Sequence, residues 1–70
     1  DLQDTLRWIV YANPKNPVDR YEIWSSKDGS PFELAGEKPP SAAVNGEITF
    51  IHQNLDPGVN YEYFIRVVMD

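Results

Sequence analysis

The feature that most limits the fold of this chain is a period-2 alternation near its end, over residues 61–69. One face of this segment carries only aromatic and aliphatic side chains, namely Tyr61, Tyr63, Ile65, Val67 and Met69. The alternate positions are mixed in character, and they are Glu62, Phe64, Arg66 and Val68. Because successive side chains of a strand point to opposite faces, this alternation predicts a β-strand with one face in a core.

Three shorter segments show the same alternation, at residues 6–11, 21–24 and 48–51. Residues 32–34 carry Phe32 and Leu34, and we expect them to form the strand that returns from the second of these segments. None of the segments shows a 3.6-residue apolar period with a capped start. Strands at this spacing predict an all-β domain, a sandwich or barrel in which about five strands can be placed.

Residues with strong turn preferences separate the predicted strands. Asp28 and Gly29 lie between two apolar segments, and this dipeptide is typical of a tight hairpin because glycine accepts the positive φ that such a turn requires. Residues 13–17 hold two prolines and predict a loop. Residues 37–46 predict a longer connection that ends in a turn at Asn45 and Gly46. The predicted strands are thus joined without the helical crossovers of a βαβ fold.

Length and charge limit the classes of function. Seventy residues form at most one domain, and we expect residues 1–70 to be a single domain that is a portion of a larger protein. The net charge is -5 and the six Lys and Arg residues are scattered, whereas a nucleic-acid partner requires clustered positive charge. No apolar stretch approaches the roughly 20 residues that cross a bilayer. We therefore expect no nucleic-acid partner and no membrane span.

Side chains that carry catalysis or bind metals are scarce. The chain has no cysteine, which excludes a thiolate nucleophile and a cysteine-based zinc site, and His52 is its only histidine. We expect His52 to be solvated at a strand end, because one histidine cannot build a His-based triad or metal cluster. The 11 acidic residues are dispersed and predict a solvated acidic surface, although a weak calcium contact between loops stays open. We therefore expect a protein that is not an enzyme, with no catalytic residue, no metal site and no cofactor.

A family resemblance rests on four features that occur in one order along the chain. They are Leu6-Arg-Trp8, Tyr21-Glu-Ile23, the Asp28-Gly29 hairpin with Pro31-Phe32 after it, and Leu55-x-Pro57-Gly58-x-x-Tyr61. Together they resemble the fibronectin type III family, in its bacterial form, and the resemblance implies an immunoglobulin-like β-sandwich with Trp8, Tyr21, Leu55 and Tyr61 at structural positions. In this class of sandwich, a tyrosine such as Tyr61 packs its ring inward and returns its hydroxyl to nearby backbone.

By comparison with this family, the sandwich is incomplete. A complete one has seven strands in roughly 100 residues. Here the first strand is reduced to residues 1–4 or missing, and the last strand, which would pair with residues 61–69, is missing. Its absence leaves unpaired backbone groups beside the most apolar segment. In decreasing order of expectation, the chain is a fragment or only the ordered part, the fold is reduced and tolerates the edge, or a second chain supplies the strand by β-augmentation.

The alternation also places large apolar side chains on faces opposite the predicted core. Trp24 and Phe64 fall on neighbouring strands of one sheet, where they would form an exposed aromatic patch. Val68 and Tyr11 extend this candidate partner-binding surface. Two interpretations stay open: the patch binds a partner, or linkers, a missing strand or adjoining domains cover it in the full protein.

The resemblance implies a non-catalytic extracellular module of a secreted or cell-surface protein, acting as a spacer or contacting a protein partner or neighbouring domain. Such modules often adjoin catalytic or carbohydrate-binding domains of bacterial secreted enzymes, which is an argument by analogy. One alternative is a carbohydrate-binding module that uses Trp24, Phe64 or Tyr11 as stacking platforms. Another is an assembly subunit that is completed by a strand from a partner chain.

Overall fold

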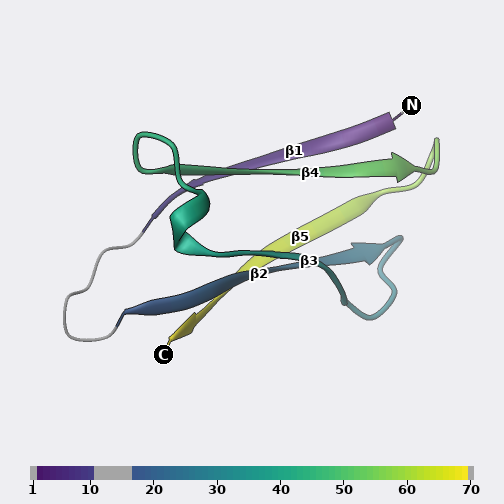
Figure 1. Ribbon diagram of the computed structural model, residues 1–70. Helices are drawn as coiled ribbons and strands as arrows, with labels where there is room; N and C mark the ends of the chain where they lie inside the picture. Colours follow the sequence, from purple (N-terminus) through teal and green to yellow (C-terminus); the bar gives the residue numbers. More distant parts are fainter. Residues whose placement is uncertain (1, 11–16, 70) are drawn as a thin grey trace.

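The computed structural model describes residues 2–10 and 17–69, and these residues form β-strands and one turn of 3-10 helix (Figure 1). The elements are β1 (Leu2–Ile9), β2 (Val18–Lys27), β3 (Glu33–Lys38), η1 (Pro40–Ala42), β4 (Glu47–Leu55) and β5 (Tyr61–Met69). They make two antiparallel sheets, one of β1 and β4, the other with β2 between β3 and β5. The prediction of an all-β chain with about five strands is confirmed.

The two sheets lie face to face, as in a β-sandwich, with β1 and β4 as one layer and β2, β3 and β5 as the other (Figure 1). Trp8 of β1 meets Tyr21 of β2 across the interface, with ring centroids 5.7 Å apart. Tyr21, Ile23 and Ile48 are almost completely buried. Removing these apolar side chains from water is the main force that holds the two sheets together.

At one point of the interface a glycine of one sheet faces a phenylalanine of the other. Gly36 of β3 is paired with Ile23 of β2, and it lies beneath the ring of Phe50 from the opposite sheet. A Cβ atom on Gly36 would lie 2.5 Å from Cε1 and 2.8 Å from Cζ of Phe50. The ring therefore occupies the space that any other residue at this position would need.

Two turns use residues with positive φ, as their sequences predict. Asp28 and Gly29 have φ values of 49° and 77°, and Asn45 and Gly46 have values of 52° and 80°. Two successive positive values are typical of the type I′ turn, whose twist matches that of the flanking strands. Both turn predictions are confirmed.

Several predicted boundaries are wrong. The first strand spans Leu2–Ile9 and not residues 6–11, so that residues 2–4 continue β1 and are no remnant of a separate strand. Pairing with β4 explains the difference, because ladder hydrogen bonds extend a strand over residues that show no alternation of their own. The connection over residues 37–46 is also shorter than predicted, since β3 continues to Lys38. Most of the predicted loop at residues 13–17 lies outside the described residues.

β5 lies at the edge of its sheet. Among the described residues its one strand neighbour is β2, with which it pairs along its whole length. The predicted inward face is half-buried at Tyr61, Tyr63 and Ile65. Val67 and Met69, however, are 44% and 41% exposed, so the alternation predicts too much burial here. The described residues leave the inner face of β5 partly uncovered toward its C-terminal end.

Candidate functional site

A cluster of large apolar side chains lies on the outer face of the three-stranded sheet. Trp24 of β2 and Phe64 of β5 are directly opposite each other, and their rings are stacked with centroids 6.0 Å apart and an interplanar angle of 3°. Phe32 meets Phe64 edge-on at 5.0 Å. Leu34 of β3 lies opposite Trp24 on its other side. We call these four residues the outer apolar cluster.

Most of the outer apolar cluster is open to solvent. Phe32, Leu34 and Phe64 are 41%, 47% and 43% exposed, and Trp24 is half-buried between its two neighbours. Adjacent aromatic side chains contribute about 0.5–1.5 kcal/mol beyond their buried area, so the stacked pair also stabilises the sheet. Large apolar side chains that are both exposed and contiguous are typical of an interaction surface.

A buried glutamate holds the indole of Trp24 in place. Glu22 is 8% exposed, and its Oε1 accepts a hydrogen bond from Trp24 Nε1 at 3.1 Å. Its Oε2 accepts one from Arg20 Nη2 at 3.1 Å, and Arg66 Nη1 lies 3.9 Å from Oε1. These partners offset the cost of removing a carboxylate from water. Hydrogen bonds to Asp19 and then to Glu22 raise the pKa of Arg20.

The burial of Glu22 corrects the prediction that the acidic residues form a solvated surface. Glu22 lies in the middle strand of its sheet, between Glu37 of β3 and Arg66 of β5, where its neighbours cover it. The alternation in the sequence shows on which face of its strand Glu22 lies. The sequence does not show which strand lies in the middle of the sheet, because that depends on pairing between distant segments.

The structure brings together only part of the predicted partner-binding surface. Trp24 and Phe64 are in contact, as expected for neighbouring strands. Val68 lies on the same face of β5 but opposite Arg20, half-buried and separated from Phe64 by Arg66. Tyr11 lies outside the described residues. The predicted surface is therefore reduced to the stacked pair.

Phe32 and Leu34 belong to the outer apolar cluster, although the sequence placed them only on a returning strand. A two-residue turn at Asp28 and Gly29 would put Leu34 opposite Ile23 and so on the inner face. The observed register differs by one residue and pairs Leu34 with Trp24. An irregularity between Ile23 and Trp24 then restores the inward position of Gly36. No signal in the sequence specifies this irregularity.

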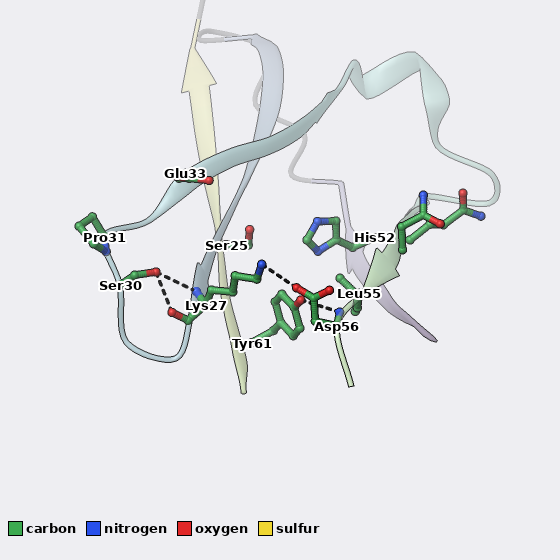
Figure 2. Close-up of a pocket in the computed structure, with 11 residues that line it drawn as sticks. Ser25, Lys27, Ser30, Pro31, Glu33, His52, Leu55, Asp56 and Tyr61 are labelled. Atoms are coloured by element: carbon green, nitrogen blue, oxygen red, sulfur yellow. Dashed lines mark hydrogen bonds and ion pairs between the residues drawn. The ribbon is translucent and has the colours of Figure 1, made fainter. Parts of the chain in front are cut away.

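A pocket of about 240 Å³ lies at one end of the molecule, where the β2–β3 turn meets the segment between β4 and β5 (Figure 2). Lys27 and Asp56 form an ion pair beside it, with Nζ 2.7 Å from Oδ2. The hydrogen bond to Asp56 raises the pKa of Lys27. The hydroxyl of Tyr61 accepts a hydrogen bond from the backbone N–H of Asp56 at 2.9 Å. This confirms the expectation that the Tyr61 hydroxyl returns to nearby backbone.

Beside this pocket, a polar network joins the two sheets. The hydroxyl of Tyr63 in β5 donates a hydrogen bond to Oδ2 of Asp4 in β1 at 2.7 Å, and Nδ1 of His52 in β4 lies 2.9 Å from the same hydroxyl. Since the hydroxyl donates its one proton to Asp4, it accepts from His52, so that Nδ1 of the ring carries a proton. Burial, reinforced by the hydrogen bond to Asp4, raises the pKa of Tyr63 above its ordinary value.

The position of His52 differs from the prediction. β4 continues to Leu55, so His52 lies within the strand and is half-buried, with its ring edge-on to Tyr61 and Tyr63. Its role in this geometry is to join the sheets, since its Nδ1 is held by Tyr63. The sequence could not indicate this, because His52 and Tyr63 come from strands of different sheets.

Two serines at this end of the molecule, Ser26 and Ser30, are held by hydrogen bonds within the β2–β3 turn. Ser26 donates a hydrogen bond to the carbonyl of Ser30, and the Ser30 hydroxyl donates to the carbonyl of Lys27 at 2.7 Å. Within residues 2–10 and 17–69, no group of three or more acidic, histidine or cysteine side chains is arranged to hold a metal ion. In the same part of the chain, no helix has the length and apolar character needed to span a membrane.

Comparisons of the chain with protein-family models, with curated proteins and with solved structures found no match. Its function is therefore inferred from its own geometry. The polar groups around the end pocket hold turns and sheets together, whereas the outer apolar cluster exposes large side chains on one face. The outer apolar cluster is the surface that this geometry supports best as a functional site.

Proposed function

We propose that this chain is a non-catalytic interaction module whose outer apolar cluster contacts a protein partner or a neighbouring domain. The observation that carries this proposal is the stacked pair of Trp24 and Phe64, flanked by the exposed Phe32 and Leu34. Aromatic side chains held rigidly in place are typical anchors of protein interfaces. Glu22 supplies the rigidity, since its carboxylate fixes the indole of Trp24 from within the sheet.

The orientation of the rings favours a protein partner over a carbohydrate. A sugar stacks on the open face of an aromatic ring, but Trp24 turns one face to Phe64 and has Leu34 opposite it on the other side. Trp24 therefore offers its ring edge, and the aliphatic side chain of Leu34 lies beside it. Such a surface fits the mixed apolar side chains of a protein interface.

We further propose that the sandwich is of the fibronectin type III class, with the extracellular or cell-surface location that this resemblance implies. The pairing of the strands supports this assignment. In immunoglobulin-like sandwiches the second strand lies beside the fifth and the third beside the sixth. The pairs β1–β4 and β2–β5 agree with this rule if β1 to β5 are the second to the sixth strands. The free edges of β1 and β5 are then the places of the first and the seventh strand.

The test uses peptides that are selected against the folded chain from a random phage-displayed library, since such peptides find the anchoring side chains of a surface. The variant Phe32→Ser with Leu34→Thr removes exposed apolar area from the outer apolar cluster. Ile9→Thr with Ile51→Thr is the matched control, because these side chains are 72% and 46% exposed in the opposite sheet.

We expect the selected peptides to bind the Phe32 and Leu34 variant at least about tenfold more weakly and to bind the control variant unchanged. Circular dichroism checks that both variants stay folded. Peptides that keep their affinity for the Phe32 and Leu34 variant would contradict the proposal. A saturable change in tryptophan fluorescence on titration with soluble polysaccharides, lost in the same variant, would favour the carbohydrate alternative.

A further inference from the structure

The pocket at the end of the molecule has polar walls that are only partly used to hold the fold together. Its lining comes from β2, the β2–β3 turn, β3, β4, Asp56 and the first residue of β5 (Figure 2). Within the described residues, the side chains of Ser25 and Glu33 make no hydrogen bond and no ion pair. His52 uses one of its two ring nitrogens, Nδ1. These three side chains therefore retain hydrogen-bonding capacity for a ligand.

Strand pairing directs these three side chains toward one space. Ser25 of β2 lies opposite Glu33 of β3 and opposite Tyr63 of β5. Residues that are directly opposite on neighbouring strands share a face of the sheet, so all three point the same way. That face is the inner one, because the hydroxyl of Tyr63 meets His52 of the other sheet. Ser25 and Glu33 thus line the pocket from one sheet and His52 lines it from the other.

The polar network fixes which nitrogen of His52 a ligand meets. Nδ1 carries the proton that is donated to Tyr63, whose own proton is donated to Asp4. In the neutral ring the other nitrogen, Nε2, therefore has a lone pair and accepts hydrogen bonds. Nε2 is open to solvent, because among the described residues Nε1 of Trp8 is the one side-chain nitrogen or oxygen that is buried without a partner. The network thus holds an acceptor at the wall of the pocket.

The charges around the pocket favour a cation over an anion. Among the described residues of its lining, Lys27 is the one cationic side chain, and it is paired with Asp56 at 2.7 Å. An anion would have to separate this pair and approach the carboxylate of Glu33. A cation would instead meet that carboxylate, which has no ion pair within the described residues. Opposite charges at short range attract more strongly where solvent is partly excluded.

We propose that this pocket binds a primary ammonium group, with Glu33 as its counterion and with Ser25 Oγ and His52 Nε2 as further acceptors. An ammonium group has three N–H donors and no acceptor, and these side chains offer three acceptors. Hydrogen bonds between ionised partners are the stronger ones, so Glu33 contributes most of the affinity. The site goes beyond the proposed function, since none of its residues belongs to the outer apolar cluster.

Titration with ethylammonium chloride tests the site, with sodium chloride as the reference for ionic strength. His52 is the only histidine, so NMR correlations of its ring nitrogens give one unambiguous set of signals. We expect Nε2 to be unprotonated in the free chain at neutral pH, and its signal to shift saturably as ethylammonium binds. Ethylammonium and Nα-acetyl-lysine amide are compared as ligands. Tighter binding of the lysine derivative would identify a lysine of a protein as the source of the ammonium group, and tighter binding of ethylammonium a free amine.

Matched variants separate the pocket from the overall charge of the chain. Glu33→Gln should weaken ethylammonium binding at least about tenfold, because it removes the counterion. Glu62→Gln removes the same charge from the outer face of β5 and should leave binding unchanged. Circular dichroism checks that both variants stay folded.

Four results would overturn the proposal. They are the absence of a saturable shift in the wild-type chain, a protonated Nε2 in the free chain, equal weakening by Glu33→Gln and Glu62→Gln, and binding of glucose as tight as that of ethylammonium. The last result would mean that the pocket takes a neutral polyol and does not use the charge of Glu33.

Discussion

At the scale of single residues, the fit between the two sheets depends on a residue without a side chain. Gly36 has no side chain, and the ring of Phe50 lies against the backbone of β3 in the space that a side chain would occupy. Its φ is not in the positive range, so the backbone itself accepts any residue. Glycine is required here only because the ring of Phe50 leaves no space for a side chain. A smaller side chain at residue 50 should therefore remove the requirement.

Gly36→Ala should lower the free energy of unfolding by about 1–3 kcal/mol, because its Cβ would overlap the ring of Phe50 and force it to move. Urea unfolding measures the change. The matched control places the same substitution in a Phe50→Leu background, where the smaller side chain leaves room. There Gly36→Ala should be neutral or slightly stabilising. If Gly36→Ala left the free energy of unfolding unchanged while Phe50 is present, the overlap with the ring would not be the reason for glycine at this position.

The hydroxyl of Tyr63 is the second single-residue determinant, because it joins Asp4 of one strand to His52 of another. Tyr63→Phe should reduce the free energy of unfolding at neutral pH by about 1–2 kcal/mol, since two half-buried polar groups lose their partner. Urea unfolding measures this loss. An unchanged unfolding midpoint would mean that water replaces the hydroxyl at no cost.

The pH dependence of stability gives a further test of Tyr63. Burial, and after it the Asp4 carboxylate, raise the pKa of Tyr63 above the ordinary value of about 10. Above about pH 10 the unfolded chain releases this proton while the folded chain retains it, so stability that is present below that pH is lost as the pH rises. The advantage of wild type over Tyr63→Phe should therefore shrink between about pH 9 and 11. An advantage that is constant over this range would contradict the prediction.

At the scale of elements, the β2–β3 turn and the segment between β4 and β5 hold each other in place. The N–H of Asp28 donates to the carbonyl of Asn60 at 2.8 Å, and the N–H of Asn60 donates to Oδ1 of Asp28 at 2.9 Å. The ion pair between Lys27 and Asp56 adds to this junction (Figure 2). Because both ion-pair residues are exposed, that pair contributes little by itself. The hydrogen bonds of Asp28 are the main connection.

Asp28→Ala should lower the free energy of unfolding by about 1–2 kcal/mol, because alanine removes the acceptor for Asn60 and tolerates the φ of 49° poorly. Asp28→Asn is the matched control. It keeps an oxygen at the same position and accepts a positive φ, so we expect its stability to stay within about 0.5 kcal/mol of wild type. Thermal unfolding of the two variants compares them. If Asp28→Asn lost as much stability as Asp28→Ala, the negative charge of Asp28 would matter and not its role as a hydrogen-bond acceptor.

The existence of the elements could be predicted from the sequence more fully than their pairing. Alternation and turn residues are local properties, and they place strands near Tyr21, Ile48 and Tyr61, as observed. The register of β3 is not local. It depends on an irregularity between Ile23 and Trp24 that brings Gly36 beneath Phe50. The outer apolar cluster follows from that register, and this explains why only its two central rings could be predicted.

At the scale of the whole molecule, the chain is more extended than a compact domain of its length. Its radius of gyration is 13.2 Å, against about 11 Å expected for 70 residues. Among residues 2–10 and 17–69 only three apolar side chains are almost completely buried, while large apolar side chains remain exposed on both faces of β5. The two sheets of the described residues therefore cover only part of the apolar surface of β5.

The sequence by itself determined the strand content, the positions of the tight turns and the separation of apolar from mixed faces, because these depend on backbone sterics and on a period of two along the chain. Tertiary structure alone determined which strands pair and which side chains come into contact. It placed Glu22 in a covered middle strand, joined His52 to Tyr63, and set the register that brings Gly36 beneath Phe50. These outcomes depend on pairing between segments far apart in sequence, where the free energy of a register is set by partners that no local pattern contains.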